Sequence, residues 1–287
     1  MIKNLSFGSD PEYFVINEAT KMIVSGIPII IGSKETPESL GDGYFVQKDN
    51  VLAEGNIPPV FHKGDFVATR DQFIYNMEEL KRRITEYIKG KYPTLGLFHS
   101  DCQELNSAFL SHPEAMQFGC SPYLNAWDDE SHVANDLSIE NFRTAGFHVH
   151  VGFDVHESTI WSRETISSMI ARAYDLFVVI PSCLVQVDLR RFENYGGLGQ
   201  YRDTSYGLEC RSLGAYFVKE KYLPWVFDQT VKAIQFATEE ENVHKLMYMA
   251  MPNISLKDGV SFDTELYTAL GISFEDQLIK TKSIIHA

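Results

Sequence analysis

The sequence has few of the features that mark secreted or membrane proteins. Its four cysteines show no CxxC spacing, so we expect reduced thiols and no disulfide framework. The longest candidate for a membrane-spanning run, Leu176–Ile180, is far too short to cross a bilayer. No apolar stretch follows a basic region at the N-terminus. These absences predict a soluble, non-secreted protein of the cytoplasm that does not bind membranes.

Positive charge is also scarce. The chain has 25 Lys and Arg against 39 Asp and Glu, a formal net charge of −14. This balance argues against a broad phosphate-binding surface for DNA or RNA. It is compatible with a site that gathers carboxylates around divalent cations.

The common nucleotide-binding motifs are missing as well. The sequence has no GxxxxGK[ST] loop, GxGxxG turn or HRD-type loop, which excludes a P-loop or a protein-kinase arrangement. Instead, three strand-like segments carry polar residues at alternate positions: Asp10-Pro11-Glu12, His148-Val149-His150 and Glu209-Cys210-Arg211. Side chains two residues apart on a strand share one face. The pattern predicts one sheet lined with carboxylates, imidazoles and guanidinium groups.

The remaining periodicity predicts an α+β protein of one domain, residues 1–287. The expected strands cover 5–17, 22–31, two segments within 43–57 around an Asp49-Asn50 turn, 94–98, 144–153 and 184–188. The expected helices cover 70–92, 158–180 with Ser158 as N-cap, and 219–238. Because a proline removes a ladder donor, Pro11 places Asp10 and Glu12 at the mouth of a strand. Residues 100–136 are expected to form a lid or substrate wall, and 240–287 show no pattern that indicates chemistry.

The polar strand positions predict a site for hard metal ions. The candidate ligands are Asp10, Glu12, Glu54, His148 and Glu209, with Asp49 or Gln47 adjoining. Glu54 lies within an apolar strand, where an isolated charge is costly unless it is paired, ligated or protonated. Oxygen-dominated sites suit Mg²⁺ or Mn²⁺ better than zinc, and this number of carboxylates suits two or more ions.

Such cations next to arginines suit a nucleoside triphosphate. Arg202 and Arg211 are the candidates for its phosphates, and Lys34 in the Gly32-Ser33-Lys34 turn is a third, although that turn also fits a plain surface loop. Arg190 and Arg191 fit either contacts to phosphoryl or carboxylate oxygens or the tips of a flexible hairpin.

Four segments together resemble the phage-type COOH–NH2 ligases of the glutamine synthetase and glutamate–cysteine ligase superfamily. They are Phe7–Phe14, Asp49–Pro59, Gly146–His150 and Tyr195–Arg211, in the family's order. The resemblance implies a glutamine synthetase-like catalytic domain, with a curved, mainly antiparallel sheet and helices on its outer face. It also implies ATP-dependent amide formation through an acyl phosphate, in the host cytoplasm if a phage encodes the protein.

The resemblance also implies individual roles. Asp10, Glu12, Asp49, Glu54, His148 and Glu209 would hold metal ions, and Glu209, Arg202 and Arg211 would act in catalysis, the two arginines on the ATP phosphates. His150, Arg191 and Asn56 would contact the substrates, a small-molecule or peptide carboxylate and an amine. Only Glu54 is a clear glutamate in the second acidic segment, so Gln47 or Asp49 must stand in for another ligand.

Two other functions fit parts of the pattern. The HxH strand also occurs in cupin-like sites, so a metal-dependent hydrolase or oxygenase could use His148, His150 and a carboxylate. That function leaves Asp10, Arg202 and Arg211 without a role. A non-catalytic module that binds a nucleotide or metabolite is the other alternative, and the retention of every metal position argues against it.

Overall fold

The computed structural model describes residues 1–116, 123–128, 131–132, 141–185, 188–255, 261–262 and 264–273. It is an α+β structure built on one large sheet in which every described pairing is antiparallel. Along the main path the strands follow the order β10-β9-β13-β14-β12-β1-β5-β4-β3, while β2, β6 and β7 also pair with β1. This confirms the α+β prediction.

The strands vary widely in length. Their bounds are β1 Ile2–Asn17, β2 Ile23–Val24, β3 Glu38–Gly41, β4 Tyr44–Asp49, β5 Leu52–Asn56, β6 Val60–Phe61, β7 Leu95–Phe98, β9 Tyr123–Asn125, β10 Ser131–His132, β12 Phe147–Val155, β13 Gln200–Thr204 and β14 Gly207–Cys210. Two further pairs stand apart from the large sheet, β8 Cys102–Glu104 with β11 Phe142–Thr144, and β15 Ile254–Ser255 with β16 Ser261–Phe262.

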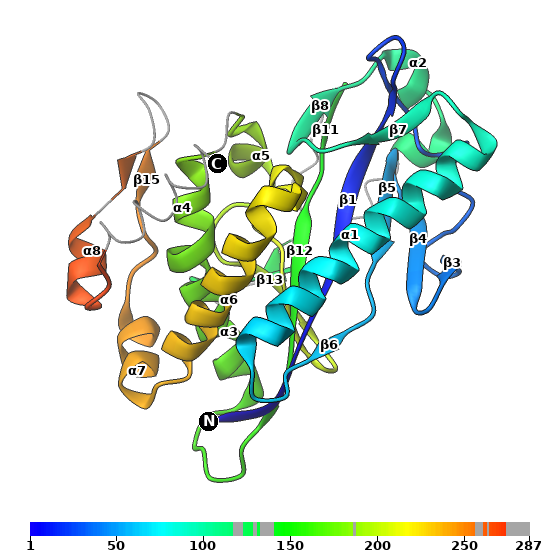
Figure 1. Cartoon of the computed structure of the whole chain (residues 1–287). Coiled ribbons are helices and arrows are strands. Elements are labelled where there is room, and N and C mark those ends of the chain that lie inside the picture. Colours follow the sequence, from blue (N-terminus) through cyan, green and yellow to red (C-terminus); the bar gives the residue numbers. More distant parts are fainter. Residues whose placement is uncertain are drawn as a thin grey trace.

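The main helices cover one face of the sheet (Figure 1). They are α1 Phe66–Lys91, α3 Arg163–Tyr174, the π-helical η2 Asp175–Val179, α4 Ile180–Cys183 and α6 Leu223–Ala237. The other helices are α2 Ser107–Leu110, α5 Arg190–Asn194, α7 Glu240–Tyr248 and α8 Thr264–Ala269, and the 3-10 turns are η1 Pro113–Met116, η3 Ala215–Val218 and η4 Glu220–Tyr222. Phe7 of β1 packs on Phe227 of α6 with ring centroids 4.7 Å apart. A Cβ on Gly55 of β5 would meet Leu80 and Ile84 of α1. The helices therefore lie on the face to which Phe7 points, which leaves the opposite face for polar side chains.

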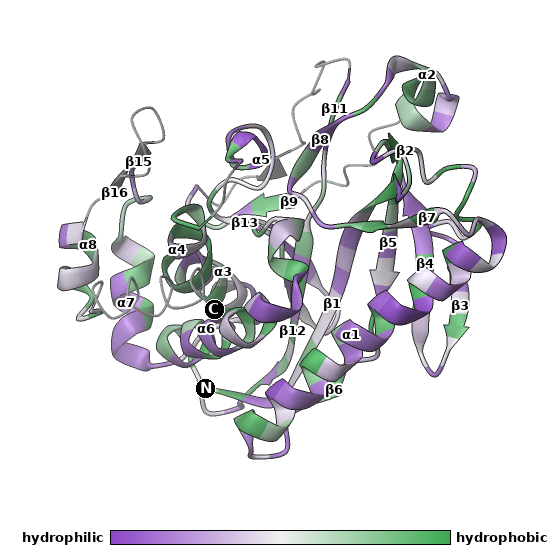
Figure 2. Cartoon of the chain, turned by 45° about the horizontal axis from the view of Figure 1, so that its top comes forward, coloured by the Kyte–Doolittle hydropathy of each residue, from purple (hydrophilic) through white to green (hydrophobic). Residues whose placement is uncertain are grey.

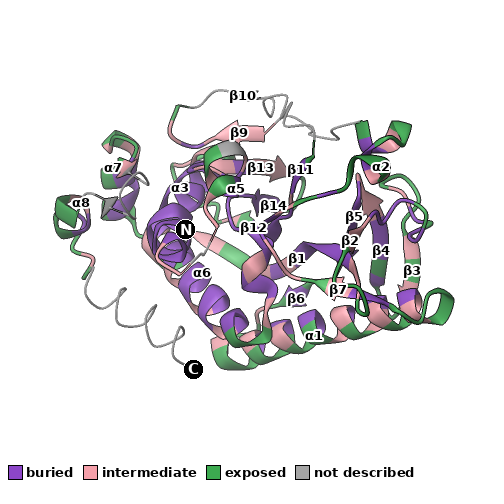
Figure 3. Ribbon diagram, turned by 90° about the horizontal axis from the view of Figure 1, so that it is seen from above, coloured by how far each residue is buried: buried purple, intermediate pink, exposed green. Residues whose placement is uncertain are grey.

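The helix layer shows the expected division of polarity. Along α1, hydrophilic and hydrophobic residues alternate in patches (Figure 2), and its buried residues include Phe73, Met77, Leu80, Ile84 and Ile88. Seen from above, α1 is exposed on its outer side and buried toward the sheet, whereas α6 is buried over most of its length (Figure 3). These buried residues recur every three or four positions, so the apolar side of the predicted amphipathic helix is the side that packs against the sheet.

The prediction for Pro11 was wrong. β1 is a central strand of 16 residues, and Asp10 and Glu12 lie in its middle. The strand tolerates the proline because its neighbour on that side changes there: β6 pairs with Ser6 and Phe7, and β5 begins pairing only at Glu12. Glu12 donates its N–H to Gly146 on the β12 side, so the N–H that Pro11 lacks would point to the other side, where none of the described strands has a residue paired with Pro11.

Three other predicted elements differ. Only Ile23–Val24 of 22–31 forms a strand, because Ile29 and Ile30 donate their N–H groups to Gly26 in a turn. The helix predicted over 158–180 begins later, with Ser162 as N-cap accepting from the N–H of Thr165. Of the strand predicted at 184–188, Leu184 and Val185 form a turn and 186–187 lie outside the described residues.

The hairpin around Asp49-Asn50, α1, the strand near residue 95 and α6 formed as predicted. Three parts of the 100–136 segment expected to form a lid, 117–122, 129–130 and 133–136, lie outside the described residues, as do 256–260, 263 and 274–287. Within the part of the chain that is described, Arg163–Cys183 is the one helix long and apolar enough to span a membrane, and its most apolar window is wholly buried. A buried core helix has the same length and composition.

Candidate active site

The predicted polar residues share the face of the sheet opposite α1 and α6. In the strand register, Asp10 on β1 lies opposite His148 on β12, and Glu12 lies opposite Glu54 on β5. His150 lies opposite Glu209 on β14, which in turn lies opposite Arg202 on β13. Five strands from distant parts of the chain thus bring these side chains to one surface. Asp10 and Glu12 on β1, and His148 and His150 on β12, are two positions apart, as the two-residue period of a strand requires.

His148 is at the centre of this cluster. Its side chain is 2% exposed, with Nδ1 3.3 Å from Asp10 Oδ1 and 3.6 Å from Glu209 Oε1, and Nε2 4.0 Å from Glu12 Oε1. Neither ring nitrogen makes a hydrogen bond to the described residues. A buried imidazole surrounded by carboxylates but bonded to none is suited to coordinate a cation.

The carboxylates have strongly perturbed acidity. Burial raises the pKa of Glu54 well above its ordinary value, and repulsion from Asp10 and Asp49 raises it further. Burial also raises the pKa of Glu12. Burial would raise the pKa of Asp10, but the charges of the two histidines outweigh it and hold that pKa well below its ordinary value. So many buried carboxylates in one place repel each other unless protons or cations neutralise them.

Guanidinium groups flank the cluster at Glu209. Arg202 Nη1 lies 3.0 Å from Glu209 Oε2, and Arg211 Nη1 donates to Glu209 Oε1. Arg211 also donates from Nη2 to the Tyr195 hydroxyl at 2.7 Å. The Nε atoms of both arginines are buried without a hydrogen-bond partner among the described residues. The two arginines thus lie where phosphate oxygens near Glu209 would meet them.

Arg191 lies beneath the site. It is 2% exposed, and its Nη1 and Nη2 donate to the backbone carbonyls of Ser212 at 2.6 Å and Arg211 at 2.9 Å. Gly196, at φ 86°, leaves room for it, because a Cβ there would overlap its guanidinium. Substrate contact was predicted for Arg191, but its guanidinium is directed at the protein backbone. This geometry supports a role in positioning Arg211.

The β4 side of the site has a different composition. Gln47 donates from Nε2 to Glu54 Oε2 at 2.8 Å, and Asp49 Oδ1 is 3.0 Å from Lys34 Nζ. Gln47 and Asp49, the two candidates for the additional ligand, therefore lie near Glu54, and Asp49 is already paired with Lys34. β4 and β13 lie on opposite sides of β1 in the sheet, so Lys34 flanks the cluster on the side away from Arg202.

His150 connects the cluster to a cavity of about 400 Å³. Its Nε2 is 2.9 Å from Asp10 Oδ1, and its Nδ1 is 2.8 Å from the Tyr206 hydroxyl. His150, Asn56 and Tyr206 all line the cavity. Two predicted substrate residues, His150 and Asn56, are thus brought together. Tyr206 and Tyr195 were not predicted as site residues, since a tyrosine in a hairpin turn or loop carries no signal in one sequence.

The donor set fits hard cations. Among the described residues, Asp10, His150 and Glu209 offer ligand atoms within 4.8 Å of one another. We favour His148 over His150 as the nitrogen ligand, because both nitrogens of His150 already have hydrogen-bond partners, whereas those of His148 have none among the residues that the structure describes. Asp10, Glu12, Glu54 and Glu209 supply carboxylate oxygens, the ligands that Mg²⁺ and Mn²⁺ prefer.

A protein-family model described as "Phage phiEco32-like COOH.NH2 ligase-type 2" matches residues 132–250. The resemblance to the phage-type COOH–NH2 ligases is confirmed. The matched segment contains His148, His150, Arg202, Glu209 and Arg211; the acidic residues on β1 and β5 precede it.

Other comparisons are more distant. The structure of a bifunctional glutathione synthetase from Pasteurella multocida aligns with this chain at a TM-score of 0.45 and 11% sequence identity. The alignment covers 99% of this chain and 46% of the synthetase chain. The chain thus spans about half the length of that protein, and a similarity this low carries no argument about fold or activity. No curated protein sequence matches the chain.

Proposed function

We propose that the protein is an ATP- and Mg²⁺-dependent carboxylate–amine ligase with a glutamine synthetase-like fold. The observation that carries the proposal is a buried cluster in which His148 lies among Asp10, Glu12 and Glu209, with Arg202 and Arg211 beside it. The ring of His148 makes no hydrogen bond within the part of the chain that the structure describes. The match to the ligase family agrees with it. We place the protein in the cytoplasm, in agreement with the burial of Arg163–Cys183, the one helix among the described residues that is long and apolar enough to span a membrane.

The reaction would take place in two displacements. A carboxylate oxygen of the first substrate attacks the γ-phosphorus of ATP, the bond from that phosphorus to the bridging oxygen breaks, and ADP leaves. The amine nitrogen of the second substrate then attacks the acyl carbon, phosphate leaves, and the amine gives up a proton. Bound divalent cations would neutralise the phosphate charge.

The chain's own residues would bind and orient the reactants. Arg202 and Arg211 would donate hydrogen bonds to phosphate oxygens, with Tyr195 and Glu209 fixing the direction of the Arg211 guanidinium. The planar fork of arginine suits this role because it makes paired bonds to phosphate. The cavity beside His150 and Asn56 would receive a substrate.

The test is ADP release in the presence of ATP and Mg²⁺ with a mixture of free amino acids and short peptides, followed by mass spectrometry of amide products. Release should require both a carboxylate and an amine. It should be lost in Glu209→Gln and kept in Glu157→Gln, which changes an exposed turn residue. Failure to bind ATP with Mg²⁺ present would overturn the proposal, and tightly held zinc or iron would favour the hydrolase or oxygenase alternative.

A further inference from the structure

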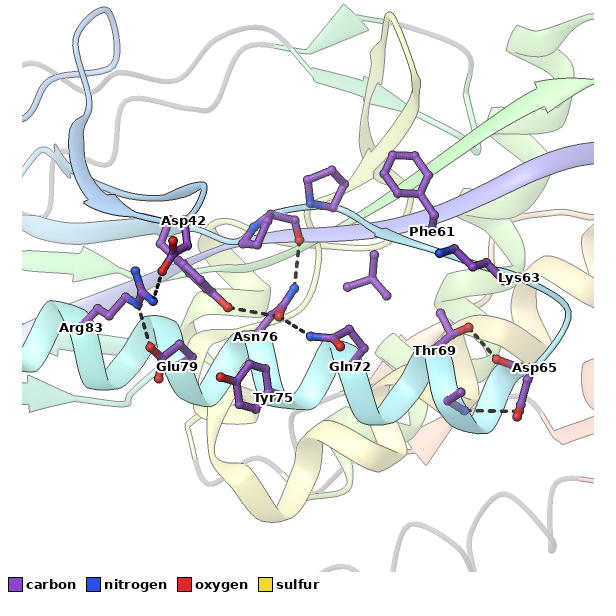
Figure 4. Close-up of a pocket in the computed structure, with 15 residues that line it drawn as sticks. Asp42, Phe61, Lys63, Asp65, Thr69, Gln72, Tyr75, Asn76, Glu79 and Arg83 are labelled. Carbon is purple, nitrogen blue, oxygen red and sulfur yellow. Dashed lines mark hydrogen bonds and ion pairs between the residues drawn. The ribbon is translucent and has the colours of Figure 1, made fainter.

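A second cavity, of about 580 Å³, lies outside the site (Figure 4). It runs between the Pro58–Lys63 segment and the outer side of α1, and the turn that joins β3 to β4 closes one end. We call it the α1 groove. Phe61 and Tyr75 on its walls are 62% and 58% exposed, which are large values for aromatic residues.

A buried amide fixes the floor of the groove. Asn76 of α1 is 5% exposed, and it donates from Nδ2 to the carbonyl of Pro58 at 3.1 Å. Its Oδ1 accepts from the Tyr44 hydroxyl at 3.1 Å and from Gln72 Nε2 at 2.8 Å. These bonds tie the strand to the helix, so the groove is a built feature rather than a gap between loosely packed elements.

The strand beside the groove has an open edge. Phe61 lies opposite Ser6, and His62 donates its N–H to Leu5 at 2.8 Å. Because antiparallel residues point their backbone groups alternately toward and away from the partner strand, the N–H and C=O of Phe61 point away from β1. β4 pairs with β5 only as far as Asn56, so among the described strands none covers this edge.

Among the described residues, the charged groups that line the groove leave one cation, Lys63, without an ion-pair partner. Arg83 lies 2.6 Å from Asp42 Oδ2 and 2.7 Å from Glu79 Oε1, and Arg82 Nη2 lies 2.6 Å from Glu79 Oε1, so both carboxylates are paired with arginines. Asp65 accepts the N–H groups of the first turn of α1. Lys63 is exposed, and no ion pair to it is found in the described part of the chain. The groove therefore suits a ligand of low charge with one acidic group at the Lys63 end.

The groove is continuous with the candidate active site. Pro59 and Phe61 line both the groove and the cavity that His150 and Asn56 border. Phe61 projects on the side of its strand away from α1 (Figure 4). A chain lying along the strand edge would thus reach the site by passing this one side chain.

We propose that the α1 groove binds an extended segment of a polypeptide substrate, which adds a strand beside Pro59 and Phe61. The substrate role rests on the proposed ligase function. From Asp65 to Arg83 the groove follows about 27 Å of α1, room for about eight extended residues. Main-chain pairing to an open edge, with side chains in flanking pockets, is how proteins bind extended peptides. Nucleic acid fits less well, because three carboxylates line the groove.

The experiment selects ligands from a displayed library of random 12-residue peptides on the full chain, without nucleotide. Enriched peptides are synthesised with a fluorophore, and Kd is measured by anisotropy. Phe61→Pro, which removes the open N–H, should weaken binding at least tenfold more than Phe61→Ala, which keeps it. Tyr75→Ala should also weaken binding, whereas Tyr248→Ala, at an exposed site on α7, should not.

A second measurement does not depend on how the variants fold. N-methylation of the peptide, one position at a time, should weaken binding only at alternate positions, because alternate N–H groups of an added strand face the protein. A photo-crosslinker on one peptide terminus should label residues of the cavity that contains His150 and Tyr206. No enrichment, or enriched peptides insensitive to both Phe61→Pro and N-methylation, would refute the groove as a peptide site.

The remaining outcomes separate the two proposals. Crosslinks confined to the groove would overturn the substrate role. Binding of ATP with Mg²⁺ is measured on the same protein. Peptide binding without ATP binding would overturn the ligase function, and ATP binding without peptide binding would overturn only the groove as a peptide site.

Discussion

His148 and His150 are two residues apart on β12 but have different neighbours. In the described part of the chain, neither ring nitrogen of His148 makes a hydrogen bond, although carboxylates surround it, whereas those of His150 are hydrogen-bonded to Asp10 and Tyr206. We expect His148→Ala to weaken Mg²⁺ activation at least about tenfold and His150→Ala mainly to raise the KM of a substrate. Titration of ADP release with Mg²⁺ and with substrate measures both. Equal losses of metal affinity would contradict this division of roles, which the sequence predicted and the unequal hydrogen bonding supports.

Arg191 and Arg190 give a matched pair of neighbouring arginines. Arg191 holds the carbonyls of Arg211 and Ser212, whereas Arg190 pairs with Asp188 and Glu104 at the surface. Arg191→Met should lower kcat at least about tenfold and reduce stability by about 1–3 kcal/mol, because buried carbonyls lose their donors. Arg190→Met should change both little. Arg191→Lys restores a charged donor group without the planar fork and should recover stability more than kcat. Full recovery of kcat would argue against positioning of Arg211.

At the scale of elements, α1 depends on its first residues. The helix follows Asp65, whose Oδ1 accepts from the N–H groups of Val67 at 2.8 Å and Ala68 at 3.2 Å. Asp65→Ala should lower the free energy of unfolding by about 1 kcal/mol, and Asp65→Asn, which keeps an acceptor, by much less. Urea denaturation of the three proteins measures the difference. Equal losses in both variants would mean that the charge, rather than the cap, stabilises this end of α1.

At the scale of the whole molecule, Asp175 of η2 links the helix layer to the side of the sheet that contains β9 and β13. Its Oδ2 accepts from Trp127 Nε1 and from the N–H of Gly199, both at 2.6 Å. Burial raises the pKa of Asp175 from 3.8 to about 8. Between these values the unfolded chain releases the proton that the folded protein keeps, so stability falls as pH rises through this range and the loss is complete above the folded pKa.

Asp175→Asn removes this titration while keeping an acceptor for both donors. Between pH 5 and 8 the wild type should lose stability relative to the variant by up to about 1.4 kcal/mol per unit. Urea unfolding at several pH values, with Glu157→Gln as the exposed control, measures the slope. Parallel pH profiles of wild type and Asp175→Asn would show that this carboxyl does not titrate in that window.

The sequence by itself determined the local chemistry of the site. Alternate polar residues on strands place Asp10 with Glu12 and His148 with His150 on shared faces, because the period of a strand is fixed by its backbone. The apolar stripe of α1 and the Asp49-Asn50 turn followed from equally local rules, with Asn50 at φ 53°.

Tertiary structure decided which strands became neighbours and how each side chain is used. Pro11 suggested a strand end, yet the change of neighbour from β6 to β5 allows it in the middle of β1. Arg191 could have been a substrate ligand by sequence, but packing directs its guanidinium to backbone carbonyls. The open edge at Phe61 depends on where β4 stops pairing. Such features arise from contacts between residues far apart in the chain, and no local pattern encodes them.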